Sequence, residues 1–121
     1  MKVIVKKYGG TSVSSVTKIK NIAKKVVDDA TRNKVVVVLS AMGKTTDQLV
    51  SLANRCTKNP DMRDYDLLVS SGEQVSISLL SMSIKDLGRD SVAYTGWQAG
   101  IRTNNSHSSA RIVDILSLIH I

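Results

Sequence analysis

The chain has 121 residues, of which 42% are hydrophobic, and a formal net charge of +7. This length and composition predict one globular domain or part of one, and no run reaches the ~18 uninterrupted apolar residues of a membrane span, so we expect no membrane segment. The N-terminus lacks the apolar core and cleavage site of a signal peptide, which predicts a cytoplasmic protein. Cys56 is the single cysteine, so no internal disulfide can form, and we interpret it as a small packing residue.

The positive charge raises the alternative of a basic nucleic-acid-binding module, whose affinity would fall steeply with salt. Two features argue against it. The lysines near the N-terminus fall on the polar positions of a predicted helix, as in a solvated face: Lys18, Lys20, Lys24 and Lys25. Aromatic residues that could stack on bases are scarce: Tyr8, Tyr65, Tyr94 and Trp97. We therefore expect no nucleic-acid partner.

A strand, a helix and a second strand are predicted within the first 40 residues. Residues 3–5 begin a short β-strand, and apolar residues from Val13 to Ala30 then recur at spacings of three and four, which predicts an amphipathic helix. Ser12 is its expected N-cap and Asn33 its stop. The run VVVVL (35–39) is typical of a strand buried on both faces of a parallel sheet, so this region forms a βαβ unit.

Further along the chain, a helix through Leu49 and Cys56 should end before Pro60. Residues 64–88 are ambiguous between strand and helix, but their length and Gly88 favour a helix with a break near Gly72. Residues 91–94 (SVAY) predict a third strand, 95–100 (TGWQAG) a loop, and a last helix is expected from about Ser108. The final letters LSLIHI (116–121) resemble a translated sequencing adapter and are interpreted as a non-native tail, the alternative being an ordinary apolar helix end.

The stretch KKYGGTS joins the first strand to the first helix. A glycine pair at such a junction lets backbone N–H groups approach an anion, and the following helix adds unpaired N–H groups and the positive end of its dipole. Lys7 can add an ammonium, and Thr11 and Ser12 add hydroxyls. The spacing is neither a Walker A loop nor G-x-G-x-x-G, and an ordinary tight turn remains the alternative.

A second polar loop follows the second strand, with Ser40, Gly43, Lys44, Thr45 and Thr46. Ligands of doubly wound sheets bind outside the carboxyl ends of the strands, so the two loops are expected to converge on one crevice. Helix capping is the alternative role for the threonines, and it is compatible with ligand contact.

The stretch KYGGTSV resembles the Lys-Phe-Gly-Gly-Thr-Ser signature of aspartate kinases, with Tyr8 where phenylalanine is usual. VVVVLSAMGKTTDQL, SSGEQVSISLL and TGWQAGI are similar to further segments of that family, in the same order and at similar separations. The likeness covers residues 1 to about 115. It implies the amino-acid kinase fold, an α/β three-layer αβα sandwich with a mainly parallel sheet, truncated here to the N-terminal portion of the catalytic domain (1–115).

The resemblance also implies a reaction, ATP + L-aspartate → 4-phospho-L-aspartate + ADP, the first step towards lysine (through diaminopimelate), threonine and methionine. By motif match, Lys7 is the catalytic cation, and Ser40, Thr46 and Glu73 bind the aspartate, Glu73 through its α-ammonium. The ATP phosphates would be bound by Lys7, Tyr8, Gly9, Gly10, Thr11 and Ser12. Mg²⁺ is expected with the nucleotide and no metal on the protein itself.

Other substrates remain open, because acetylglutamate, glutamate, carbamate and uridylate kinases share this architecture; Thr46 and Glu73 in their motifs favour aspartate. The family's adenine and ribose contacts, its arginine for the substrate α-carboxylate and its regulatory ACT domains lie beyond this chain. The resemblance therefore implies an inactive fragment of a homo-oligomeric protein. Trp97 is interpreted as a packed or loop-anchoring aromatic, and His107 and His120 as bystanders.

Overall fold

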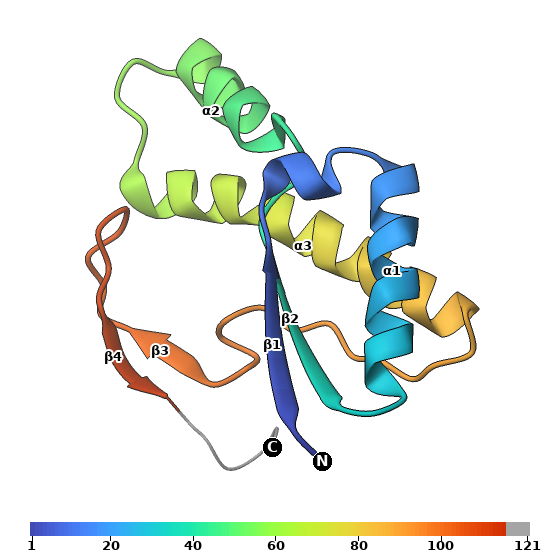
Figure 1. The fold of residues 1–121 in the computed structure, drawn as a ribbon. Helices are drawn as coiled ribbons and strands as arrows, with labels where there is room; N and C mark the ends of the chain where they lie inside the picture. Colours follow the sequence, from blue (N-terminus) through green and yellow to red (C-terminus); the bar gives the residue numbers. More distant parts are fainter. Residues whose placement is uncertain (116–121) are drawn as a thin grey trace.

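The computed structural model describes residues 1–115 (Figure 1). Its elements in chain order are β1 (Val3–Tyr8), the 3₁₀-helix η1 (Gly10–Val13), α1 (Val16–Ala30), β2 (Lys34–Leu39), α2 (Thr45–Cys56), α3 (Met62–Asp86), β3 (Ile101–Thr103) and β4 (Ile112–Ile115). The expected non-native tail and His120 lie outside the described residues, so both interpretations stay predictions.

The first 40 residues form the predicted βαβ unit. β1 and β2 pair in parallel with a register that runs from Val3 opposite Lys34 to Tyr8 opposite Leu39. Side chains of a strand alternate between its two faces, so one face of this small sheet carries Tyr8, Val37 and Leu39, and these pack against the buried core.

The opposite face of the sheet is open to solvent in the described residues. Val5 is 65% exposed and Val36 is 49% exposed, and Val3 and Val38 are similarly exposed. The prediction of a second strand buried on both faces is therefore wrong for this chain, because helices pack on one side of the sheet only. Residues 1–115 build two of the three layers of the expected sandwich.

Helix α1 begins later than predicted. Gly10–Val13 first make a 3₁₀ turn, and the N-cap is Ser15, whose hydroxyl accepts a hydrogen bond from the Lys18 N–H at 3.2 Å. The helix ends at Ala30, three residues before the predicted stop. The lysines of its polar face are exposed, as predicted.

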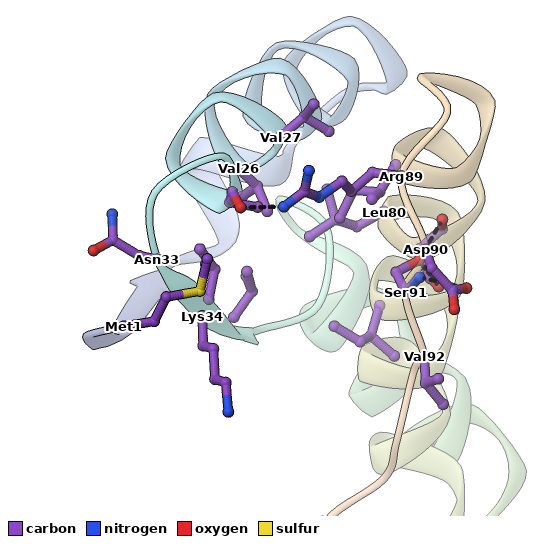
Figure 2. A pocket seen from close by; sticks show the side chains of 16 residues that line it. Met1, Val26, Val27, Asn33, Lys34, Leu80, Arg89, Asp90, Ser91 and Val92 are labelled. Carbon is purple, nitrogen blue, oxygen red and sulfur yellow. Dashed lines mark hydrogen bonds between the residues drawn. The ribbon is translucent and has the colours of Figure 1, made fainter. Parts of the chain in front are cut away.

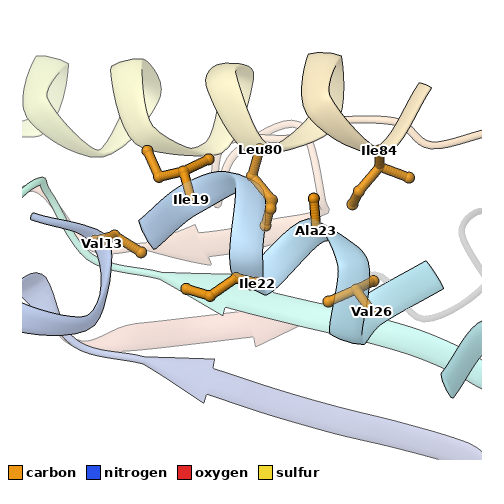
Figure 3. Packing of buried hydrophobic residues seen from close by; sticks show 7 residues of the cluster. All are labelled: Val13, Ile19, Ile22, Ala23, Val26, Leu80 and Ile84. Carbon is orange, nitrogen blue, oxygen red and sulfur yellow. The ribbon is translucent and has the colours of Figure 1, made fainter. Parts of the chain in front are cut away.

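The core lies between α1, α3 and the covered face of the sheet (Figure 3). Apolar side chains from the two helices interdigitate there, and Leu80 and Ile19 are almost completely buried. The buried cluster comprises Val13, Ile19, Ile22, Ala23, Val26, Leu80 and Ile84. Burial of this surface is the main force that holds α3, which is far along the chain, against the βαβ unit.

Helix α3 is continuous over 25 residues, so the ambiguous segment is a helix and the expected break at Gly72 is wrong. Gly72 is instead buried where α3 meets the second loop. The helix ends as predicted at Gly88 (φ +84°): the Gly88 N–H donates to the Lys85 carbonyl and the Arg89 N–H to that of Ile84, a Schellman motif. By length and composition alone α3 could also cross a membrane, a weak indication because core helices of soluble proteins pass the same test.

The C-terminal third departs most from the predictions. Residues 91–95 form no strand, and 101–115 form an antiparallel hairpin, β3 with β4, where a helix was predicted from Ser108. Trp97 is 73% exposed and Cys56 is exposed, so neither packs in the core; the loop-anchoring role of Trp97 stays a prediction.

Candidate functional site

The two polar loops meet at the carboxyl edge of the sheet, as the sequence predicts. The Gly43 N–H of the second loop donates to the Gly10 carbonyl of the first at 2.8 Å, and the Ser40 N–H donates to the Tyr8 carbonyl at 3.3 Å. Parallel pairing of β1 and β2 delivers both loops to the same edge, and these hydrogen bonds then join them.

The two glycines of the first loop have different structural roles. A Cβ on Gly10 would lie 3.1 Å from the carbonyl oxygens of both Ala41 and Gly43, so Gly10 lets the loops approach closely. A Cβ on Gly9 would meet nothing within 4 Å, and its backbone (φ −83°, ψ 175°) suits any residue. The space beside Gly9 is therefore open to a ligand, and neither packing nor backbone conformation requires a glycine there.

We expect alanine substitutions at these two positions to change stability in opposite directions. Gly10→Ala should lower the free energy of unfolding by about 1–3 kcal/mol, because both crowding atoms are backbone oxygens that cannot rotate away. Gly9→Ala should raise it by up to about 1 kcal/mol through the unfolded chain's lost freedom. Urea unfolding followed by far-ultraviolet circular dichroism measures both, and equal effects would contradict the distinction.

The adjacent lysines of β1 face opposite sides of the sheet. Lys6 turns towards α1 and makes an ion pair with Asp29, and this hydrogen bond raises the pKa of Lys6 above its ordinary value. Lys7 lies on the open face and is exposed. Lys6 therefore ties β1 to the end of α1, while Lys7, one residue before the end of the strand, can place its ammonium beside the first loop.

The residues predicted to bind an amino acid come from three elements that are held together at this edge. Ser40 follows β2, Thr46 lies in the first turn of α2, and Glu73 lies on α3; all three are half-buried. Buried Ser76 of α3 donates its hydroxyl hydrogen bond to the Ser40 carbonyl at 2.7 Å. Helix α3 is thereby fixed to the loop that presents Ser40.

A close helix–loop contact places Glu73 next to that loop. A Cβ on Gly72 would lie 3.0 Å from the Ala41 Cβ and 3.4 Å from the Thr45 Cγ2, so α3 approaches the second loop and α2 more closely than a larger residue would allow. Neither this role of Gly72 nor that of Ser76 was predicted from the sequence. Their spacing of four, which puts two small residues on one helix face, was the available signal.

Another concavity lies at the other end of the strands (Figure 2). This cavity of about 350 Å³ lies among the end of α1, the start of β2, α3 and residues 89–92, and Arg89 closes part of it by donating to the Ala30 carbonyl. Val92, from the segment predicted to be a strand, lines it together with Val35 and Val37 of β2. It contains none of the predicted site residues.

The family model for the amino acid kinase family matches residues 2–120. The chain belongs to the amino acid kinase family. It is 55% identical over 116 residues to aspartokinase 2 of Bacillus subtilis and 52% identical to an aspartokinase of Geobacillus stearothermophilus. Each match covers 95% of this chain but 28% of the relative, so the chain spans little more than a quarter of these kinases' length.

Solved kinase structures show the same fold. The crystal structure of an aspartate kinase from Synechocystis superposes with a TM-score of 0.79 at 44% identity, covering 84% of this chain and 17% of that one. E. coli aspartokinase III, solved in complex with aspartate and ADP, gives a TM-score of 0.79 at 22% identity, covering 93% of this chain and 35% of that one. The predicted amino-acid kinase fold is thus confirmed.

Proposed function

We propose that this amino acid kinase segment belongs to an aspartate kinase, which transfers the γ-phosphoryl group of ATP to the side-chain carboxylate of L-aspartate and yields 4-phospho-L-aspartate and ADP. The observation that supports it is the junction of the two loops at the sheet's carboxyl edge, with an exposed lysine and open space beside Gly9. The identity of 55% to a protein named aspartokinase points to this acceptor.

The reaction needs positive charge more than it needs a base. The attacking side-chain carboxylate, with a reference pKa of about 3.9, is already ionised at neutral pH. The barrier is the approach of an anion to the polyanionic triphosphate, so catalysis depends on positioning and on charge placed where negative charge develops. Lys7 and the backbone N–H groups of Gly9 and Gly10 are the groups proposed to supply it, with Thr11, Ser12 and Tyr8 around them.

The amino-acid substrate is assigned to the neighbouring part of the same edge. Ser40 and Thr46 would donate hydrogen bonds to it, and the carboxylate of Glu73 would pair with its α-ammonium, a charge-assisted contact stronger than a neutral one. Among residues 1–115 no group of three or more His, Cys, Asp or Glu side chains gathers as a metal site. We propose that Mg²⁺ arrives with the nucleotide, where it would neutralise phosphate charge.

The wider role is part of the same proposal. We place the whole protein in the cytoplasm, at the first step towards lysine, threonine and methionine, as a homo-oligomer with regulatory ACT domains. The chain spans 28% of the length of its curated relatives. We propose that residues 1–121 alone do not catalyse the phosphorylation of aspartate.

A chimera tests the proposal. Residues 1–115 would replace the matching segment of B. subtilis aspartokinase 2, and aspartyl phosphate would be trapped as its hydroxamate. We expect turnover with L-aspartate within about tenfold of the host, none with L-glutamate or N-acetyl-L-glutamate, and none from residues 1–121 alone. Glu73→Gln in the chimera should raise KM for aspartate at least about tenfold, which corresponds to 1.4 kcal/mol.

Gln74→Ala is the matched control for Glu73→Gln, because Gln74 is the next residue of α3 and is exposed. It should leave KM for aspartate unchanged. A chimera that folds but phosphorylates glutamate in preference to aspartate would contradict the assignment of the acceptor.

A further inference from the structure

The β3–β4 hairpin (residues 101–115) is an arm with almost no core of its own. Every residue from Ile101 to Ile115 is exposed, including the apolar side chains of Ile112, Val113 and Ile115. Its strands have three and four residues, with an irregular register between Arg102 and Thr103. Since a short two-stranded hairpin is marginal alone, and this one buries little, apolar packing does not fix its position.

The loop that joins β3 to β4 lies beside the start of α3 (Figure 1), where the carboxylate of Asp66 binds it. Asp66 accepts hydrogen bonds from the Ser108 N–H at 2.8 Å and from the Ser108 hydroxyl at 3.1 Å. The His107 Nδ1 lies 3.3 Å from Asp66 Oδ2, the oxygen that also accepts the Ser108 N–H. The Ser108 hydroxyl also lies 3.3 Å from the Met62 sulfur. His107 thus has a structural contact, and its expected absence from the site chemistry stays a prediction.

Two further observations single out this contact. Ser108 has φ +65°, a left-handed conformation that is uncommon for a residue other than glycine, and in that conformation both its N–H and its hydroxyl reach Asp66. The hydrogen bond from the Ser108 N–H, followed by the other contacts with Ser108 and His107, lowers the pKa of Asp66 below its ordinary value. The ionised carboxylate is thus the form that this arrangement favours.

The contact lies on the same helix as Glu73, the residue proposed to bind the substrate α-ammonium. Asp66 and Glu73 are seven residues apart, which is two helical turns, so they share one face about 10 Å apart along the axis. The tip of the hairpin is thereby kept on the face of α3 that presents Glu73.

We infer that Asp66 is a carboxylate latch, which binds the tip of the 101–115 hairpin to α3 and so fixes the position of this arm. The inference concerns the arm's position and does not depend on the proposed acceptor. Loss of the negative charge leaves one acceptor oxygen in place of the two that now bind the Ser108 N–H and hydroxyl, and it removes the ionic partner of His107. The remaining contact of the Ser108 hydroxyl, with the Met62 sulfur, is a weak one.

The test measures the arm's position in the 121-residue chain. Spin labels at Ala110→Cys and Lys25→Cys, in a Cys56→Ser background, report the distance between the arm and α1 by double electron–electron resonance. We expect a narrow distribution in the parent and a distribution at least twice as broad in Asp66→Asn. Hydrogen exchange of the Ser108 amide should accelerate at least tenfold in the same variant.

Asp64→Asn is the matched control, since it removes the same charge two residues away, from a carboxylate with no hydrogen bond to the described hairpin. It should leave both measurements at the parent values. Ser108→Ala removes the hydroxyl that donates to Asp66 from the hairpin side of the contact. Ser108 is exposed and lies outside the core, so the core should still fold, and the distance distribution should also broaden. Parent-like distance distributions in both Asp66→Asn and Ser108→Ala would overturn the inference.

Discussion

Replacing Lys7 by methionine is expected to lower kcat of the B. subtilis chimera by about 10²–10³-fold, the range found when one preorganised charge-stabilising donor is removed from an active site. The side chain is exposed at the end of β1, so its loss leaves no buried partner unpaired. Methionine keeps an unbranched chain and removes the ammonium. Steady-state kinetics with ATP and L-aspartate measure the change, and urea unfolding should show unaltered stability.

The neighbouring lysine supplies the matched control. Lys6→Met makes the same substitution one residue earlier, but on the face that packs against α1, where it breaks the ion pair with Asp29. This variant should unfold at a lower urea concentration and keep the kcat of the parent chimera. A large loss of kcat in Lys6→Met with none in Lys7→Met would refute the assignment of the catalytic cation.

The N-terminal βαβ unit could be predicted because its signals are local. The period of three and four in α1, the β-branched run of β2 and the change of pattern at the glycine pair each specify an element within a few residues. The meeting of the two loops followed from the parallel topology alone, since the carboxyl ends of adjacent parallel strands lie at one edge.

The errors concern features that depend on partners distant in the sequence. The β-branched run that includes Val36 and Val38 predicted a strand buried on both faces. One face of β2 has no covering helix within residues 1–115, so these two side chains are exposed. Gly72 read as a helix break because the approach of Ala41, thirty-one positions earlier, cannot be seen in the local pattern. Residues 101–115 alternate too briefly to indicate strands, and the contact that positions them is with Asp66.

Within the candidate site, sequence identified the loops but did not distinguish the roles of neighbouring residues. The sequence does not distinguish Gly9 from Gly10. In the structure Gly9 faces open space, whereas Gly10 lies close to two backbone carbonyl oxygens. The strand period could have separated Lys6 from Lys7, because alternate residues of β1 face opposite sides. That reasoning needs only the direction of one reference side chain, such as Tyr8.

Leu80→Ala is expected to lower the free energy of unfolding of the chain by about 2–5 kcal/mol, the usual cost of emptying a buried leucine site. Leu80 is 1% exposed and lies where α3 meets α1 and the sheet, so the cavity would open between all three (Figure 3). Because Leu80 and Ser76 lie one turn apart on α3, this packing also supports the hydrogen bond that fixes the Ser40 carbonyl. Urea unfolding of the parent and variant measures the loss.

Leu67→Ala makes the same change on the same helix at a side chain that is 71% exposed. It makes the same small change in intrinsic helix propensity without opening a cavity, so its effect should stay within about 0.5 kcal/mol. The difference between the two variants isolates the packing of α3 on the βαβ unit from the helix's own propensity. Equal losses would mean that α3 does not pack on the βαβ unit through Leu80, and the placement of Glu73 beside the second loop would then lose its support.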